Sequence, residues 1–159
     1  MALFYLVRHG YTDWVDRAIA GRLPGIHLNA LGREQIRCLG EKLEKNPFDC
    51  ICAGPLERTC ETAEPLALAR GMEFRISEDF HEVDFGDWTG REVSTLSGNH
   101  WERFNSFRSG TRIPRGEMML EVQGRMISGL EKLADEFPGG RIAVVSHADP
   151  IKTVIAHFA

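Results

Sequence analysis

Residues Leu3-Phe4-Tyr5-Leu6-Val7-Arg8-His9-Gly10 form an unbroken apolar run that ends in a charged cluster. Such a run is typical of a short strand that is buried on both faces of a parallel sheet. The charged cluster then lies at the carboxyl end of the strand, where open α/β sheets bind their ligands. This stretch therefore predicts both a buried strand and the position of a ligand site.

The rest of the chain alternates between strand-like and helix-like segments. Apolar runs predict further strands at 49–53, 73–76 and 141–146. Apolar residues at helical spacing predict helices that begin at the cap Asn29, span 56–69 and 117–137, and begin again at the cap Asp149. The stretch 81–90 is too irregular for either element. This order predicts an α/β fold, a three-layer α/β/α sandwich with a mostly parallel central sheet.

The composition excludes several classes of function. The 159 residues are 43% hydrophobic and 26% charged, as in an ordinary globular domain. A formal net charge of −4 gives no broad basic surface for nucleic acid. No apolar run approaches the roughly 20 residues that span a bilayer, and Met1 leads into a strand rather than a signal peptide. We therefore expect a cytoplasmic protein that binds neither nucleic acid nor membrane.

Three further motifs help to interpret the cluster Arg8-His9-Gly10. They are Pro55-Leu56-Glu57-Arg58-Thr59 with Thr62-Ala63, Glu82-Val83-Asp84-Phe85-Gly86-Asp87-Trp88-Thr89-Gly90, and Val145-Ser146-His147. Together with the first stretch, and in the same order and approximate separation, they resemble the motifs of the histidine phosphatase (phosphoglycerate mutase-like) superfamily. The similarity covers nearly the whole chain. It implies a phosphoglycerate mutase-like arrangement of the predicted sandwich.

The resemblance implies a role for each motif residue. His9 would be the nucleophile and would form a phosphohistidine, which splits one displacement into two easier ones. Arg8, Arg58 and His147 would surround the phosphoryl oxygens and stabilise their charge. Glu82 would protonate the leaving oxygen and then deprotonate the attacking water. The implied enzyme is a phosphoryl-transfer enzyme.

The acid and the substrate contacts have further candidates. The resemblance implies a substrate-binding set that consists of Arg8, Thr12, Gly21, Arg58 and His147. Asp84 and Asp87 compete with Glu82 for the acid role, because they lie in the same loop. Glu82 is favoured by its register with the Phe-Gly-x-Trp-x-Gly pattern, and Glu78 and Glu117 are more distant candidates.

The chain departs from the family pattern at accessory positions. Tyr11 stands where the family often has Glu, and Val15 stands where an Asn usually follows the Trp, so one customary hydrogen bond to the phosphate is in doubt. The segment 25–29 and the pair Ala53-Gly54 also differ from the usual residues. Because the implied catalytic residues are all present, we expect the lining of the pocket to vary rather than the chemistry.

Three functions fit these residues. A phosphomonoester hydrolase acting on a small organic phosphate is favoured, because only a short segment lies between Gly90 and Pro114 and leaves the phosphohistidine accessible to water. The alternative is a cofactor-dependent phosphoglycerate mutase, which would use 2,3-bisphosphoglycerate. A non-catalytic phosphate-binding relative would normally lack His9 or Glu82, and both are present.

The sequence predicts neither a metal nor another cofactor. The pair of potential ligands in His147-Ala148-Asp149 has no third ligand spaced to join it. The cysteines do not show paired C-x-x-C spacing; they are Cys38, Cys50, Cys52 and Cys60. Three arginines, Arg22, Arg112 and Arg115, could meet a second anionic group of a substrate, although exposed arginines are more often solvated.

The remaining expectations concern organisation and partners. We expect residues 1–159 to form a single histidine phosphatase domain, and relatives that generally continue past the final helix leave open whether its C-terminal elements are complete. The expected partner is a small phosphorylated substrate. Neither the identity of that substrate nor the oligomeric state follows from the sequence.

Overall fold

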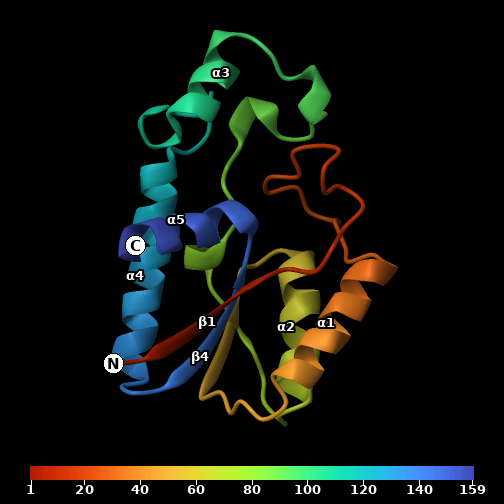
Figure 1. Cartoon of the computed structure of the whole chain (residues 1–159), viewed down its shortest axis with the longest axis vertical. Coiled ribbons are helices and arrows are strands. Elements are labelled where there is room, and N and C mark those ends of the chain that lie inside the picture. Colours follow the sequence, from red (N-terminus) through yellow and green to blue (C-terminus); the bar gives the residue numbers. More distant parts are fainter.

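A four-stranded parallel sheet forms the centre of the computed structural model, which describes residues 1–159 (Figure 1). The strands are β1 (Leu3–Arg8), β2 (Cys50–Ala53), β3 (Arg75–Ile76) and β4 (Arg141–Ser146). Their order across the sheet is β1-β4-β2-β3, and every pairing is parallel. The predicted α/β fold with a parallel sheet is confirmed.

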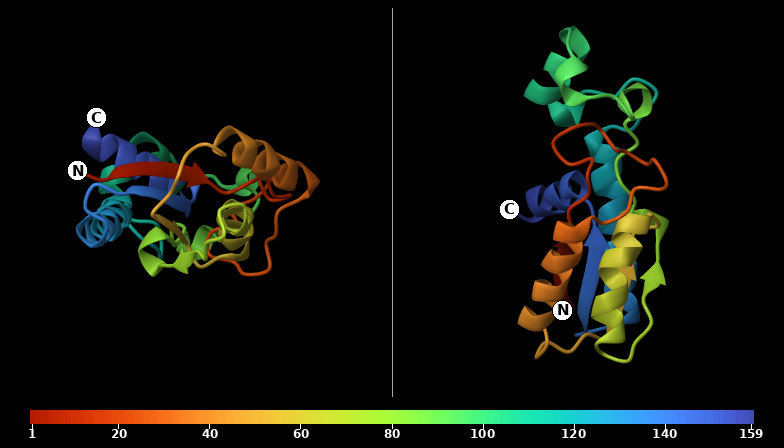
Figure 2. Two further views of the ribbon diagram at one scale, coloured as in Figure 1. Left: turned by 90° about the horizontal axis from the view of Figure 1, so that it is seen from below. Right: turned by 90° about the vertical axis from the view of Figure 1, so that its right-hand side faces the viewer.

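Helices cover both faces of the sheet (Figure 2). The helices are α1 (Ala30–Lys42), α2 (Glu57–Leu68), α3 (Asn99–Ser106), α4 (Met119–Glu136) and α5 (Ala148–Phe158). Because side chains alternate along a strand, Ala143 and Val145 of β4 pack toward α2, whereas Ile142 and Val144 pack toward α4 and α5. None of the helices combines the length and the apolar character that crossing a membrane requires.

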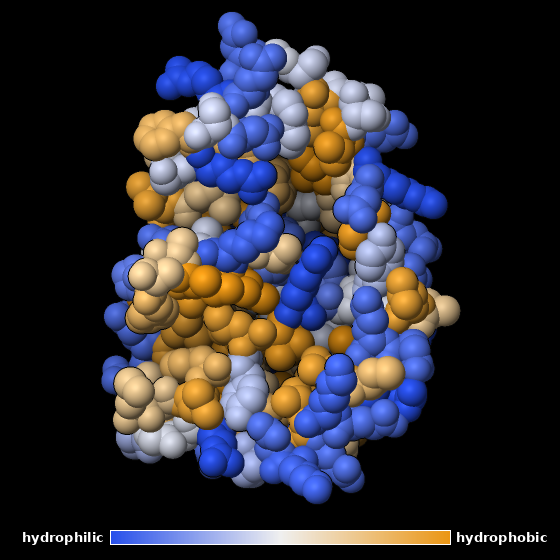
Figure 3. Space-filling model, viewed as in Figure 1, coloured by the Kyte–Doolittle hydropathy of each residue, from blue (hydrophilic) through white to orange (hydrophobic).

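The expectation that the first strand is buried on both faces was wrong. β1 pairs only with β4 and is one of the two edge strands of the sheet, so Val7 is its one buried residue and Leu3 is 51% exposed. The strands in the centre of the sheet are the buried ones: β2 is buried throughout, and β4 is buried from Ile142 to Ser146. Figure 3 shows an apolar surface on the side of the molecule where β1 and α5 lie. Ile155 and Phe158 of α5 are exposed.

Helix starts were predicted with mixed success. Asn29 caps α1 as expected, because its side chain accepts a hydrogen bond from the Gly32 N–H. The predicted cap of α5, Asp149, instead lies in the first turn of the helix, because His147 is the last residue with extended backbone angles. α4 begins at Met119, two residues after the expected start at Glu117.

The segment between β3 and α4 contains a helix that the sequence did not predict. α3 lies at the far end of the molecule (Figure 1), where Trp101 and Phe104 pack against Trp88. This segment is tied to the loop that follows β1, because the Ile19 N–H donates to the Arg91 carbonyl. The stretch 81–90 is irregular, as predicted, apart from one short 3₁₀ turn at Gly86–Trp88.

Candidate active site

Two histidines meet at the carboxyl ends of adjacent strands. β1 and β4 pair with Arg8 opposite Ser146. His9 and His147, which directly follow these residues, therefore lie next to each other. The His9 N–H continues the ladder by donating to the Ser146 carbonyl at 3.0 Å. The rings of His9 and His147 consequently lie edge to face, with their centroids 5.1 Å apart.

The protonation state of His9 is set by one backbone contact and by burial. Its Nδ1 lies 2.7 Å from the Gly10 carbonyl oxygen. Because a carbonyl can only accept, Nδ1 carries the proton and Nε2 keeps its lone pair. Burial, together with the positive charges of Arg58 and Arg8, lowers the pKa of His9 to about 4. The ring is therefore neutral at ordinary pH and is a potential nucleophile at Nε2.

The backbone beside His9 is fixed by a residue whose importance sequence reasoning missed. The Gly10 N–H donates to Thr62 Oγ1 at 3.0 Å, and that hydroxyl donates to the Arg58 carbonyl at 2.7 Å. Thr62 thus links the strand end that carries His9 to the helix that carries Arg58. The available signal was its place in the second motif, four residues after Arg58 and one helical turn along the same face.

Arg58 brings a buried positive charge to the site. The residue is only 1% exposed, and its Nη2 donates to the Gly21 carbonyl at 2.7 Å. Its Nη1 is buried without a hydrogen-bond partner. Burial lowers the pKa of the guanidinium, with partial compensation from the charges of Glu82 and Glu57. Gly21 adopts a left-handed φ of 49°, which glycine tolerates better than other residues.

His147 lies on the inner side of the site. It is fully buried, and neither of its ring nitrogens has a hydrogen-bond partner. Its Nδ1 is 3.5 Å from Glu82 Oε2. Burial holds the pKa of His147 well below its usual value, and the nearby charge of Arg58 lowers it further. This histidine is therefore not a satisfied core residue, because both of its ring nitrogens lack a hydrogen-bond partner.

Glu82 is a carboxyl group that can hold its proton near neutral pH. Its side chain is 14% exposed, and its Oε1 accepts a hydrogen bond from the Val83 N–H at 2.8 Å. Burial raises the pKa of Glu82 to about 7, despite the opposing charges of Arg58 and Arg125. Such a pKa is typical of carboxyls that act as general acids.

The competing carboxylates are engaged elsewhere. Asp84 accepts from the Gly86 N–H at 2.9 Å, and Asp87 pairs with Arg115. Glu117 is paired with Arg125 at 3.0 Å, and the Glu78 side chain is 80% exposed. None of the four lines the cavity that contains His9.

Most of the predicted residues line a cavity of about 200 Å³. Its walls include Arg8, His9, Thr12, Gly21, Arg58 and Glu82. His147 contacts this group from the buried side through His9 and Glu82. Asp149, which was expected only to cap a helix, also lines the cavity and pairs with Arg108 at 3.3 Å. All the predicted site residues except His147 thus line one cavity, and His147 contacts two of them.

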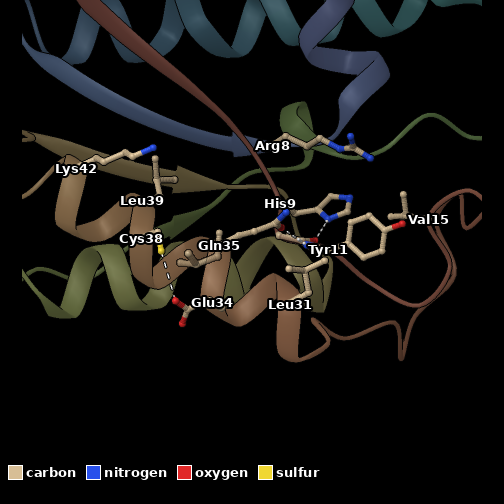
Figure 4. Close-up of a pocket in the computed structure, with 12 residues that line it drawn as sticks. Arg8, His9, Tyr11, Val15, Leu31, Glu34, Gln35, Cys38, Leu39 and Lys42 are labelled. Atoms are coloured by element: carbon tan, nitrogen blue, oxygen red, sulfur yellow. Dashed lines mark hydrogen bonds between the residues drawn. The ribbon is translucent and has the colours of Figure 1, made fainter.

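A second, larger cavity of about 510 Å³ meets the first at His9. It lies between β1 and α1, with Arg8 and His9 at one end and Lys42 at the other (Figure 4). Arg8 is exposed, borders both cavities and donates no hydrogen bond within the protein. Its guanidinium is therefore free to reach a ligand oxygen.

Comparison with known proteins agrees with this arrangement. The model of the histidine phosphatase superfamily (branch 1) matches residues 4–159. The chain belongs to the histidine phosphatase superfamily. It is 32% identical to phosphoglycerate mutase-like protein 4 of Arabidopsis thaliana over 156 residues, which cover 94% of this chain and 67% of the relative.

Solved structures of other members have the same fold. YhfR of Bacillus stearothermophilus superposes with a TM-score of 0.89 at 28% identity, over 99% of this chain and 80% of that one. A phosphoserine phosphatase from Entamoeba histolytica, in complex with phosphoserine, superposes with a TM-score of 0.85 at 28% identity, over 98% and 78% of the two chains. This histidine phosphatase is accordingly a phosphoryl-transfer enzyme.

Proposed function

We propose that this histidine phosphatase hydrolyses small phosphomonoesters through a phosphohistidine on His9. The observation that carries the proposal is the set of buried, unpaired polar atoms around His9, namely Nη1 of Arg58 and both ring nitrogens of His147. Buried polar groups are nearly always paired, and leaving one unpaired costs about 1–3 kcal/mol. A phosphoryl group in the cavity supplies the oxygen atoms that these groups lack.

In the first step, the lone pair of His9 Nε2 attacks phosphorus, and the bond from phosphorus to the leaving oxygen breaks. Glu82 gives its proton to that oxygen, so an alcohol departs and Glu82 becomes a carboxylate. The Gly10 carbonyl stabilises the positive charge that forms on the phosphorylated ring, through the Nδ1–H contact. The negative charge of the phosphoryl group favours the protonated form of His147, which then donates to a phosphoryl oxygen.

In the second step, water attacks the phosphohistidine, and the Glu82 carboxylate takes a proton from that water. Phosphate leaves, and both His9 and protonated Glu82 are restored. Arg8, Arg58 and His147 supply the positive charge that phosphoryl transfer requires. The scheme uses no metal or cofactor, so activity should survive treatment with chelators.

The other walls of the cavity favour a substrate with an uncharged leaving group. Trp14, Val15, Ile19 and Phe85 contribute apolar surface, and the carboxylates Asp16 and Asp149 would repel a second anionic group. The arginines considered for a second anionic group are instead paired with carboxylates, Arg22 with Glu117, Arg112 with Glu121 and Arg115 with Asp87. This pairing supports a phosphomonoesterase rather than a mutase that must recognise the carboxylate of phosphoglycerate.

A panel of phosphomonoesters, with and without 2,3-bisphosphoglycerate, tests the proposal. We expect phosphate release from aryl and alkyl phosphates, weaker activity on 3-phosphoglycerate, and no requirement for the bisphosphate. Interconversion of phosphoglycerates that depends on 2,3-bisphosphoglycerate and outpaces hydrolysis would instead establish the mutase. Phosphate binding without turnover of any ester would indicate a non-catalytic relative.

A further inference from the structure

The loop that carries Glu82, residues 79–87 (the Glu82 loop), is hydrogen-bonded along its main chain to the guanidinium of Arg125. Arg125, on α4, donates from Nη1 to the carbonyl oxygens of Asp79 and His81, at 3.0 and 2.7 Å, and from Nη2 to that of Glu82, at 3.0 Å. Its Nε and Nη2 also donate to the Glu117 carboxylate, at 3.0 and 3.2 Å. A guanidinium offers five N–H donors in a fixed fork, and these contacts use all of them.

Glu117 joins this guanidinium to the loop and to a second arginine. Its Oε2 accepts from the Asp84 N–H at 2.8 Å and lies 3.0 Å from Arg22 Nη2. Arg22 also donates from Nε to the Glu82 carbonyl at 2.9 Å. Burial opposes the charge of Glu117, but the hydrogen bonds from Arg125 and the Asp84 N–H hold the pKa of its carboxyl below the usual value. The Glu82 carbonyl therefore accepts from two arginines that one carboxylate bridges.

This network acts on the main chain of the loop. Arg22, Glu117 and Arg125 do not line the cavity that contains His9 and Glu82, so they do not touch the phosphoryl group. A general acid must stay within hydrogen-bond reach of the oxygen it protonates, and a misplacement of about 1 Å can cost about 10²-fold in rate. The contacts to the main chain at Glu82 therefore determine the geometry of proton transfer.

We propose that Arg125, bridged through Glu117 to Arg22, is a positioning residue for proton transfer by Glu82. This inference rests on the proposed function, because it assigns the network a part in the step that Glu82 performs. A lysine keeps the positive charge but has three donors on a flexible stem. It cannot reproduce three carbonyl contacts and two carboxylate contacts together, so the guanidinium should matter beyond its charge.

The test compares Arg125→Lys with Arg70→Lys. Arg70 is a matched control, because its guanidinium donates to the carbonyl oxygens of Asn46, Leu66 and Leu43 at the end of α2 away from Arg58. Alcohol release in the first turnover is measured with an alkyl phosphate and with p-nitrophenyl phosphate, and inhibition is measured with inorganic phosphate.

We expect Arg125→Lys to slow the alkyl phosphate by about 10- to 100-fold, because a displaced acid no longer reaches the oxygen that needs it. p-Nitrophenyl phosphate should lose less, since its leaving group needs less protonation, and inhibition by phosphate should not change. Arg70→Lys should leave the ratio of the two rates as it is in the wild type. That ratio does not depend on the folded fraction, so a loss of stability alone cannot move it.

A second readout is the pH dependence. Burial and Asp149 raise the pKa of Glu82, whereas the hydrogen bond from the Val83 N–H and the charges of Arg58 and Arg125 lower it. His147 faces the carboxyl at 3.5 Å. Arg125→Met should therefore move the alkaline limb of the rate to higher pH, while Arg125→Lys leaves it in place. An unmoved limb in Arg125→Met, together with an unchanged ratio of the two rates in Arg125→Lys, overturns the inference.

Equal losses for the two substrates in Arg125→Lys also overturn it. Glu82→Gln, measured alongside, separates this result from failure of the proposed function. If Glu82→Gln shows a loss that depends on the leaving group and Arg125→Lys does not, the network alone is rejected; if neither shows one, both proposals are rejected. Should Arg125→Lys fail to fold, Glu117→Gln replaces it and must change the same ratio.

Discussion

The two histidines and the glutamate of the site are held in place by different kinds of hydrogen bond. His9 and His147 follow strands that pair over six residues, and the ladder continues into the His9 N–H. Glu82 lies in a loop without strand pairing, and its carbonyl depends on side-chain donors from Arg22 and Arg125. The position of the histidines thus follows from the sheet itself, whereas the position of the glutamate depends on a few side chains.

This structural difference corresponds to a division of roles in the proposed mechanism. In the proposed mechanism, the strand ends supply the nucleophile His9 and the donor His147, and the first turn of α2 supplies Arg58. The loop supplies the group that must match the leaving oxygen of each substrate. Substitutions at the strand ends should therefore affect every substrate alike, and substitutions around the loop should discriminate between leaving groups.

The largest expected effect on one side of this comparison comes from Glu82→Gln. The amide cannot donate the proton that the leaving oxygen needs, so first-turnover release of an alkyl alcohol should slow by about 10²- to 10⁴-fold. Release of p-nitrophenol should slow much less, and binding of inorganic phosphate should persist. If p-nitrophenol release falls as far as alkyl alcohol release, Glu82 is not the acid, and Asp84 or Asp87 becomes the next candidate.

Arg58→Met tests the groups that bind the phosphoryl oxygens. Loss of the buried guanidinium should lower kcat/KM by about 10²- to 10³-fold for all substrates. Because burial disfavours this charge and its Nη1 has no partner, the variant should also unfold at a higher temperature than the wild type. Arg112→Met removes an exposed arginine paired with Glu121 and is the control. A decrease in melting temperature for Arg58→Met would show that the unpaired guanidinium stabilises the fold.

A smaller effect is expected where the strand end meets α1. A Cβ added at Gly10 would lie 2.7 Å from the Gly32 carbonyl oxygen, so Gly10→Ala must push backbone against backbone. We expect it to lower the free energy of unfolding by about 1–3 kcal/mol, measured by urea denaturation. Gly124→Ala is the matched control, because nothing lies near that position and alanine favours a helix by up to about 1 kcal/mol. Equal stability of the two variants would show that the contact is easily relieved.

The smallest expected effect is on the pH dependence of the rate. Glu82 must be protonated to act as an acid, so with a pKa of about 7 the rate should fall as the pH rises above 7. His9 has a pKa of about 4 and stays neutral above pH 5, so the acid limb should report the second ionisation of the substrate, near pH 6. The alkaline limb should disappear in Glu82→Gln, and its persistence there would assign it to another group.

The sequence predicted most of the sheet because its strands are short apolar runs that end at charged or glycine residues. It did not predict that β1 lies at an edge, since an apolar run has the same appearance at the edge and in the centre of a sheet. It missed α3 because only two aromatic residues of that helix, Trp101 and Phe104, pack inward and its start at Gly98 has no side-chain cap.

The site was predicted through its motifs rather than through its surroundings. His9, Arg58, Glu82 and His147 each stand in a recognisable pattern; the first three line one cavity, and His147 contacts Glu82. Arg125 could not be found in the same way, because it is an ordinary polar residue on a long amphipathic helix. Its contacts with three carbonyl oxygens of the Glu82 loop exist only once the chain has folded.

The most direct test of the central claim is to look for phosphate on His9. Incubation with a turned-over phosphomonoester, followed by rapid denaturation, should trap a label that is stable in base and labile in acid. His9→Ala should carry no label and show no turnover, while it still binds inorganic phosphate through Arg58 and His147. A label that persists in His9→Ala, or turnover by that variant, would contradict a mechanism in which His9 is the nucleophile.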